Sequence, residues 1–329
     1  MKRLLYLGYY FKQLNWPLFR KFMRHTTETT GVSRFKQWRQ LIACSLRYNI
    51  SLLEFYQFRF LGQSPQSRST WAGTGTMYEF QLTANPPATR KVLNDKREFY
   101  SAYKPFFRHQ LLTVAEIESS PERVAALLRD HSVLVCKAAS GNCGRQVAFF
   151  ETSGKDVQQL GNFLHSGKYD LVETFAQQHP ALNELSPSAV NTVRIFTRLG
   201  DRAEVIVLGC RLRISVNCKV DNLAAGNLAA PIDEQTGIVT GPGVYSDITK
   251  PDEPIHPITK VPIIGFQLPF WPETIKLAKD AARLHPQNRS IGWDIVVTPD
   301  GPGLIEGNHD WCKLVWQMPV KQGLKHLLA

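Results

Sequence analysis

Hydrophobic and polar residues alternate along this chain with two periods, one typical of strands and the other of helices. Runs rich in apolar and β-branched residues predict strands at 110–117, 131–138, 145–151, 169–174, 192–198 and 204–214. Helical spacing and capping residues predict helices at 95–103 and 272–284, and helices that begin near Ser120 and Ser153. Because strands and helices do not alternate strictly, we expect an α+β fold with largely antiparallel sheets.

The first 75 residues differ from the rest of the chain. Large aromatic residues and basic residues are interleaved over residues 1–25, where Pro17 interrupts any single helix. A broad apolar face predicts a helix over 33–60, and polar, turn-rich sequence at 62–75 predicts a linker. We therefore expect a basic helical segment over residues 1–65 and a catalytic domain over residues 66–329.

Composition places the chain among ordinary soluble globular proteins. Hydrophobic residues make up 43% of the chain and charged residues 20%. No apolar run is long enough to span a bilayer and the N-terminus lacks a secretory pattern, so neither a membrane span nor a signal peptide is expected. The six cysteines form no CxxC pair, which favours reduced thiols in a cytoplasmic protein.

Most of the net charge of +11 lies near the N-terminus. Residues 1–70 contain twelve Lys and Arg residues against only Glu28 and Glu54. A nucleic-acid-binding domain would carry its basic surface on the folded body, so this distribution argues against nucleic acid as a partner. Basic residues beside aromatic ones suit an anionic membrane surface, which makes residues 1–25 a candidate for peripheral membrane contact. Alternatively, these aromatic side chains pack against the 33–60 helix or the catalytic body.

The most informative stretch lies near the C-terminus. Apolar residues flank Asp294 before a Pro/Gly-rich turn at 299–303 and flank Glu306 and Asn308 after it, which predicts a β-hairpin. Side chains two residues apart share a face of a strand, so Glu306 and Asn308 point the same way, and the hairpin can fold Asp294 toward them. Two carboxylates and an amide oxygen form the kind of site that Mg²⁺ prefers. The alternative is an ordinary hairpin with outward acidic residues.

Three further residues are candidates for a phosphate-binding site. Lys137 ends a buried strand before the glycine-bearing loop 140–144, whose N–H groups can hold phosphate oxygens, although the pattern is not a Walker A motif. Lys96 follows Asp95 at the start of a helix, and Glu173 ends a strand. Taken singly, each has an ordinary alternative: a solvated lysine at a strand end, a surface lysine and a capping carboxylate.

Taken in order, these features resemble the ATP-grasp superfamily. The series is an Asp-Lys pair opening a helix, a strand lysine with a glycine loop, a strand ending in Glu, an Arg-bearing strand and the Asp…Glu-x-Asn hairpin. Within that superfamily the chain is most similar to the branch associated with sugar-transfer and surface-polysaccharide genes. That similarity covers roughly residues 75–320 and is carried by segments 190–194, 220–222, 256–259, 265–271 and 292–294.

The resemblance implies an ATP-grasp fold, in which two α+β subdomains clasp ATP between antiparallel sheets. It implies ATP and Mg²⁺ as cofactors. Lys96 and Lys137 would bind the ATP phosphates, Gly141 and Gly144 would shape the loop over them, and Glu173 would lie near the adenine or ribose. Asp294, Glu306 and Asn308 would bind one or two Mg²⁺ ions, and Arg194 or Arg213 would stabilise charge on the transferring phosphoryl group. Many members place an arginine two residues before the first acidic metal ligand, where this chain has Gly292. The anion-stabilising arginine must therefore come from another strand.

The substrate pocket is less clearly marked. Asn222 and Asn227, within the glycine-rich stretch 221–243, can line a pocket for an acceptor. His256 can act as a base or bind an anion, and it can equally be a structural residue ahead of its proline. The identity of the substrate does not follow from these residues.

The leading hypothesis is an ATP-dependent ligase that joins a carboxylate to an amine or hydroxyl through an acyl phosphate, on a surface-polysaccharide or sugar-linked substrate. Phosphoryl transfer relies on positioning and charge neutralisation, so no nucleophilic side chain is required. Within the same fold, the alternative is a phosphotransferase acting on a sugar or polyol hydroxyl. A non-catalytic membrane- or anion-binding protein is the alternative from another class. We expect a cytoplasmic protein that can lie at the inner face of the membrane.

Overall fold

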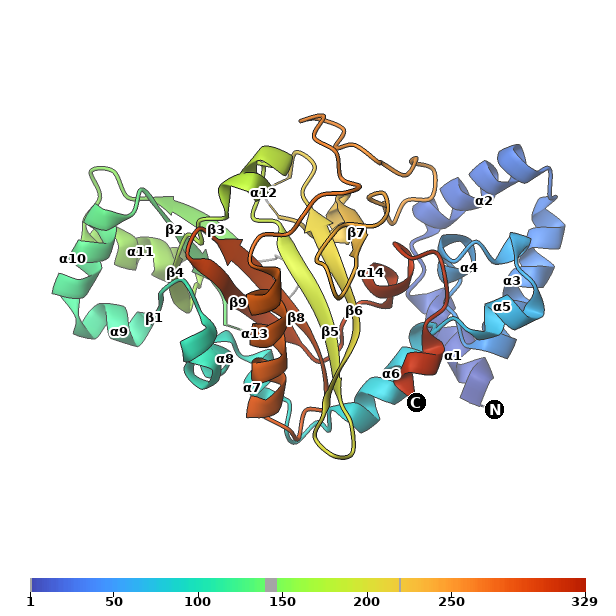
Figure 1. Ribbon diagram of the computed structural model, residues 1–329, viewed down its shortest axis with the longest axis horizontal. Helices are drawn as coiled ribbons and strands as arrows, with labels where there is room; N and C mark the ends of the chain where they lie inside the picture. Colours follow the sequence, from blue (N-terminus) through green and yellow to red (C-terminus); the bar gives the residue numbers. More distant parts are fainter. Residues whose placement is uncertain (1, 140–146, 219) are drawn as a thin grey trace.

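The computed structural model describes residues 2–139, 147–218 and 220–329. Two antiparallel sheets and a group of N-terminal helices make up this part of the chain (Figure 1). The five-stranded sheet stands in the middle, with the four-stranded sheet on one side and the N-terminal helices on the other. All pairings between the strands of these sheets are antiparallel, which confirms the expected α+β class.

The smaller sheet has the order β1-β4-β2-β3. Its strands are β1 (Leu111–Thr113), β2 (Val133–Lys137), β3 (Val147–Glu151) and β4 (Leu171–Thr174). Apolar side chains on one face pack against three helices, which are α9 (Val114–Ser119), α10 (Pro121–Asp130) and α11 (Val157–Gly167).

Two expectations for this region were wrong in detail. The strand expected over 110–117 stops at Thr113, because Thr113 and Glu116 form a capping box that begins helix α9 instead. The helix expected from Ser153 begins four residues later, where Asp156 accepts a hydrogen bond from the Gln159 N–H at 2.8 Å. Local capping therefore decided both boundaries.

The larger sheet has the order β7-β6-β5-β8-β9. Its strands are β5 (Thr192–Leu199), β6 (Val205–Ile214), β7 (Leu228–Ile232), β8 (Ser290–Thr298) and β9 (Gly301–Asn308). Side chains such as Val193, Leu212 and Ile295 form an apolar face that packs with helix α13 (Trp271–Leu284). The alternate residues on these strands form the opposite face, which carries charged side chains.

Short helices flank the edges of this sheet. Helices α7 (Lys91–Asn94) and α8 (Lys96–Tyr103) lie against β9, and α12 (Pro180–Leu185) adds Leu182 and Leu185 to the same core. The helix expected over 95–103 is therefore present as α8, with Asp95 as its N-cap. Its first residue, Lys96, is thereby fixed beside the strand that ends at Asn308.

The N-terminal segment is helical, as expected. Its helices are α1 (Lys2–Lys12), α2 (Trp16–Thr30), α3 (Arg34–Tyr48), α4 (Glu54–Gln57), α5 (Pro65–Ser69) and α6 (Thr74–Ala84). Pro17 lies in the first turn of α2, where the Asn15 side chain accepts a hydrogen bond from the Leu18 N–H at 3.1 Å. The helix expected over 33–60 is divided in two, because Asn49 adopts a left-handed conformation at the end of α3.

Aromatic residues of this segment are partly buried and partly exposed. Tyr10, Phe19 and Phe22 are buried in a cluster that also contains Val244 and Met318 of the body. Leu4, Leu5, Tyr9 and Trp16 are exposed, so peripheral membrane contact stays a prediction that now concerns these residues. Within the described residues, every helix is too short or too polar to cross a bilayer.

The end of the sequence expected to be a linker, residues 71–75, packs against the C-terminal part of the chain, whereas residues 62–70 are mostly exposed. Trp71 and Ala72 are buried. The Ala72 N–H donates to the Gln317 side-chain oxygen at 2.9 Å, and the Gln317 amide donates to the Ala72 carbonyl at 3.0 Å. Gln317 is the last residue of helix α14 (Lys313–Gln317), so this helix holds the segment in place. The expectation of a linker was therefore wrong for residues 71–75.

A buried ion pair joins the N-terminal helices to the body. The Lys313 ammonium lies 2.9 Å from the Glu54 carboxylate, and Glu54 is only 1% exposed. The same carboxylate accepts hydrogen bonds from the Ser51 and Thr74 N–H groups at 2.7 and 3.0 Å. A buried charge of this kind is tolerated because its partner and its hydrogen bonds are all present.

We expect Glu54→Gln to lower the free energy of unfolding by about 3 kcal/mol or more, because it leaves the Lys313 charge buried without an anion. Urea denaturation followed by tryptophan fluorescence measures the change. The control is Glu79→Gln, which removes the exposed partner of Lys2, 2.8 Å away, and should cost about 1 kcal/mol or less. Equal losses in the two variants would contradict a buried, structural pair.

Candidate functional site

The β8–β9 hairpin brings the three predicted metal ligands to one end of the larger sheet. Asp294 and Glu306 are register partners across the two strands, and Asn308 pairs with Gly292 one step further along. The Asn308 amide donates a hydrogen bond to the Glu306 carboxylate at 3.1 Å. The juxtaposition that the sequence pattern predicted is therefore present in the fold.

Asp294 lies between two buried arginines. Arg194 is its register partner on β5, and its guanidinium donates to both carboxylate oxygens, with Nη2 2.7 Å from Oδ2. Arg213, on β6, donates from Nη1 to the same Oδ2 at 2.8 Å. The Arg194 side chain is 8% exposed, that of Arg213 is 6% exposed and that of Asp294 is 3% exposed, so the three charged groups are shielded from water. Arg194 and Arg213, which the sequence analysis gave as alternatives, therefore both bind the Asp294 carboxylate.

Arg213 also contacts the loop that follows β6. Its Nη2 lies 2.6 Å from Asp221 Oδ1 and donates to Asn222 Oδ1 at 2.7 Å. Asp221 is held in turn by the Thr192 N–H at 2.9 Å. Burial disfavours the charge of Arg213, but Asp221 and Asp294 outweigh burial and raise its pKa above the ordinary value. Arg213 is therefore fixed as a cation.

The two acids of the hairpin differ in their pKa values. Burial favours neutral Asp294, but the Arg194 and Arg213 guanidinium groups outweigh burial and hold the pKa of Asp294 well below its usual value. Burial, followed by the charge of Asp294, raises the pKa of Glu306. The repulsion between these neighbouring carboxylates is the kind that a bound cation would relieve.

The residues at this end fit a magnesium ion that is shared with a phosphorylated ligand. Glu306 and Asn308 are partly exposed and present a carboxylate and an amide oxygen, whereas the oxygens of Asp294 already accept bonds from arginines. Among the described residues, no three His, Cys, Asp or Glu side chains are grouped to hold a metal ion alone. Mg²⁺ commonly binds one or two carboxylates together with substrate phosphates and water, which matches this donor set.

A second charged group lies on the smaller sheet. The Lys137 ammonium, at the end of β2, forms an ion pair with Glu173 on the neighbouring strand β4. His109 Nε2 lies 3.6 Å from the same carboxylate. Burial alone would raise the pKa of Glu173, but Lys137 and His109 lower it to about 2. Glu173 is thus ionised at neutral pH and holds Lys137 at the strand end.

Lys96 connects the two charged groups. Its N–H donates to the Ala139 carbonyl at 3.1 Å, and its ammonium lies 3.4 Å from the Ala138 carbonyl, beside the end of β2. Burial lowers the pKa of Lys96. Among its charged neighbours, Glu306 opposes that shift and Lys137 adds to it. Lys96 therefore lies within electrostatic range of both the smaller sheet and the hairpin.

The remaining candidates are placed differently. Gly141 and Gly144 lie outside the described residues. Asn227 is fully buried, and its side chain bonds to the Val216 N–H and to the carbonyls of its own loop. His256 is 1% exposed, with Nε2 2.9 Å from the Ser215 carbonyl and Nδ1 3.1 Å from the Thr259 N–H. Both side chains serve the local structure, and of the three substrate candidates only Asn222 contacts the arginine cluster.

Gly292 has a steric role. A β-carbon at this position would lie 2.6 Å from the β-carbon of Trp311, closer than real side chains approach. Arginine therefore does not fit at position 292, and the cations next to Asp294 come from β5 and β6, as the departure from the usual pattern implied.

Two residues that contribute to these charged groups, His109 and Asp221, were not predicted from the sequence. His109 precedes β1 in an unpatterned stretch and reaches Glu173 only through the pairing of β1 with β4. Asp221 stands in a segment that carried the family resemblance, but nothing in its local pattern marked it as the partner of Arg213.

Comparison with known proteins gives one family and several distant structures. The profile of a family described as sugar-transfer associated ATP-grasp matches residues 76–329. No protein of curated function matches the chain.

Among solved structures, the chain is similar to the ADP complex of N5-carboxyaminoimidazole ribonucleotide synthetase, with 10% identity and a TM-score of 0.40 over 66% of this chain and 45% of that one. It is also similar to D-alanyl-alanine synthetase A from Vibrio cholerae, with 13% identity and a TM-score of 0.40 over 73% of this chain and 62% of that one. A third similar structure is D-cycloserine synthetase DcsG, with 11% identity and a TM-score of 0.44 over 84% of this chain and 94% of that one. The chain spans less than half the length of the first of these. Because all three TM-scores are below 0.5, the family assignment rests on the profile.

We expect Asp294→Asn to lower the free energy of unfolding by about 3 kcal/mol or more, since it removes the anion between two buried guanidinium groups. Urea denaturation provides the measurement. Asp201→Asn is the control, because Asp201 is 95% exposed in its pair with Arg289 and its substitution should leave the free energy of unfolding nearly unchanged. If Asp294 served only as an open metal ligand, the substitution would relieve its repulsion with Glu306 and leave the apoprotein as stable or more stable.

Proposed function

The chain belongs to the sugar-transfer associated ATP-grasp family, and on that premise we propose that it is an ATP-dependent ligase acting on a sugar-linked substrate. The reaction joins a carboxylate to an amine or hydroxyl and converts ATP to ADP and phosphate. Its substrates are a small-molecule or glycan-linked carboxylate and an acceptor.

The observation that carries this proposal is the convergence of charges from the two sheets on Lys96. The Lys96 N–H and ammonium contact the Ala139 and Ala138 carbonyls just after Lys137 on the smaller sheet, at 3.1 and 3.4 Å. Helix α8 packs against β9, which carries Glu306. Cations beside a carboxylate–amide pair are what a polyphosphate with a magnesium ion requires. We therefore assign Lys96 and Lys137 to the phosphates of ATP and Glu173 to the positioning of Lys137.

The chemistry takes two steps. A carboxylate oxygen of the substrate attacks the γ-phosphorus of ATP, the bond from that phosphorus to the β,γ-bridging oxygen breaks, and ADP leaves with the electron pair. An amine nitrogen then attacks the acyl carbon, the bond from that carbon to the phosphate oxygen breaks, inorganic phosphate leaves and the nitrogen loses a proton to solvent. A hydroxyl acceptor follows the same course through its oxygen.

The residues of the chain contribute positioning and charge. Arg194 and Arg213, held by Asp294, place two fixed cations beside the end of the hairpin, where negative charge on a transferring phosphoryl group needs compensation. A bound Mg²⁺ would neutralise charge on the β- and γ-phosphates, with Glu306 and Asn308 as ligands beside Asp294. Asn222, on the far side of Arg213, is the residue that we assign to the acceptor end of the site.

A phosphotransferase acting on a sugar or polyol hydroxyl is the alternative, and the products distinguish the two reactions. The test incubates the full chain with ATP, MgCl₂ and hydroxylamine and with each of a panel of uronic acids, amino acids and polyols. Hydroxylamine captures an acyl phosphate as a hydroxamate that ferric chloride detects. A ligase gives hydroxamate, ADP and inorganic phosphate in equal amounts with a carboxylate. A phosphorylated polyol without phosphate release would overturn the proposal in favour of the alternative.

We expect Glu306→Gln to abolish this Mg²⁺-dependent ATP turnover while leaving the fold intact, because the loss of one anionic ligand removes charge neutralisation worth several kcal/mol. ADP formation and circular dichroism are measured together. Glu122→Gln, on the exposed face of α10, serves as the control and should leave turnover unchanged. Near-normal turnover by a folded Glu306→Gln protein would exclude Glu306 as a metal ligand.

A further inference from the structure

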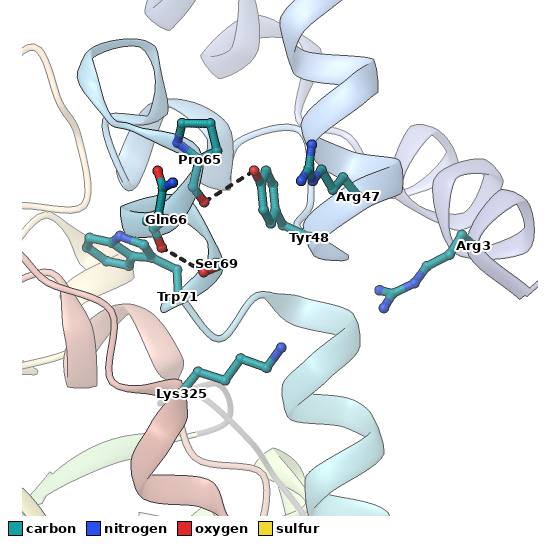
Figure 2. A pocket seen from close by; sticks show the side chains of 8 residues that line it. All are labelled: Arg3, Arg47, Tyr48, Pro65, Gln66, Ser69, Trp71 and Lys325. Carbon is teal, nitrogen blue, oxygen red and sulfur yellow. Dashed lines mark hydrogen bonds between the residues drawn. The ribbon is translucent and has the colours of Figure 1, made fainter.

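A pocket of about 370 Å³ lies between helices α1, α3, α5 and the C-terminal 3-10 helix Lys325–Leu328 (Figure 2). It is lined by Arg3, Arg47, Tyr48, Pro65, Gln66, Ser69, Trp71 and Lys325. None of these residues belongs to the hairpin or to the smaller sheet, which lies on the opposite side of the five-stranded sheet (Figure 1). The volume is within the range of small-molecule sites, and the pocket is distinct from the candidate catalytic site.

The charged side chains that line this pocket are all positive. Its lining contains three cationic side chains, Arg3, Arg47 and Lys325, and no acidic one. Over residues 2–139, 147–218 and 220–329, none of the three forms an ion pair. Figure 2 shows the Arg3 guanidinium and the Lys325 ammonium pointing toward the same space from opposite sides, with Arg47 beside the Tyr48 ring. Gathering cations in this way favours an anionic ligand.

A neighbouring pocket shows that this imbalance is not general. It is lined by the basic residues Arg59, Lys250 and Lys321, but also by Asp247 and Asp252. Lys321 lies 2.6 Å from Asp252, and Arg59 lies 4.0 Å from the same carboxylate. The basic surface is thus compensated there by acids of the body, whereas the pocket of Figure 2 lacks them.

The walls of the pocket are fixed by contacts between distant parts of the chain. The Lys325 N–H donates to the Thr70 carbonyl at 2.8 Å, and a β-carbon at Gly323 would come within 2.3 Å of Thr70. Trp71 is buried and stacks on Phe58 with ring centroids 4.4 Å apart. These contacts fix the backbone around the pocket and the Trp71 ring, whereas the three cationic side chains are exposed to solvent.

We propose that this pocket binds a small sugar phosphate. A phosphate monoester supplies the negative charge that three cations lack, and it can be bound by guanidinium and ammonium groups together. The Gln66 amide lies in the same lining and can bond to sugar hydroxyls. The Ser69 hydroxyl donates to the Gln66 carbonyl at 2.6 Å and can accept a hydrogen bond from a sugar hydroxyl. The proposal does not depend on the ligase reaction, since no residue is shared with that site.

Isothermal titration of the full chain in 150 mM NaCl tests the proposal, with glucose 1-phosphate, inorganic phosphate and glucose as probes. We expect saturable binding of glucose 1-phosphate, weaker binding of phosphate and none of glucose. Lys325→Gln and Arg47→Gln should each weaken glucose 1-phosphate binding at least tenfold. Arg20→Gln, an equal charge change at an exposed position of α2, is the control and should leave binding unchanged.

Three outcomes would overturn the proposal. The first is the absence of saturable binding, or a loss in Arg20→Gln as large as that in Lys325→Gln, which would indicate only unspecific attraction to a basic surface. The second is loss of binding in Lys137→Ala, which would place the ligand at the candidate catalytic site instead. The third is equal affinity for inorganic phosphate and glucose 1-phosphate, which would exclude recognition of the sugar.

Discussion

The ion pairs of Asp294 with Arg194 and Arg213 are the interaction on which the polar face of the central sheet depends. Three adjacent strands, β6, β5 and β8, each place one of these side chains on that face. Without the carboxylate, two guanidinium groups would face each other in a site shielded from water, at a cost of several kcal/mol. The acid therefore fixes both cations where phosphoryl charge is expected, and through Arg213 it also positions the loop at Asp221.

The N-terminal helices are part of the same folded unit as the region matched by the family profile. That match begins at residue 76, yet Lys313 within it has its anion at Glu54, and Gln317 binds the backbone of Ala72. The division at residue 65 stays a prediction, but the contacts across it are extensive. The basic segment is thus both a structural cover for the C-terminal helices and the source of the cationic pocket.

Local sequence pattern predicted most of the fold because strand periodicity and helix capping are local properties. It missed β7, which lies in a glycine-rich stretch. It also misjudged residues 71–75, whose burial depends on Gln317 far along the chain. In the site, the hairpin pattern predicted the approach of Asp294 to Glu306. The pairing of Asp294 with arginines was not predictable, because it depends on the register of β8 against β5 and β6, which lie about a hundred residues earlier in the sequence.

The close contact of Gly292 with Trp311 constrains how this lineage can change. Because the clash is with the β-carbon of Trp311, arginine at position 292 would require glycine at 311 or a shift of the backbone, and losing Trp311 would remove a large side chain from the cluster that also holds Phe196 and Trp316. The two substitutions are each harmful alone and compatible only together, which is epistasis with a steric cause. Glycine at position 292 is therefore compatible with any residue at 311, whereas a side chain at 292 demands glycine at 311 or a displaced backbone.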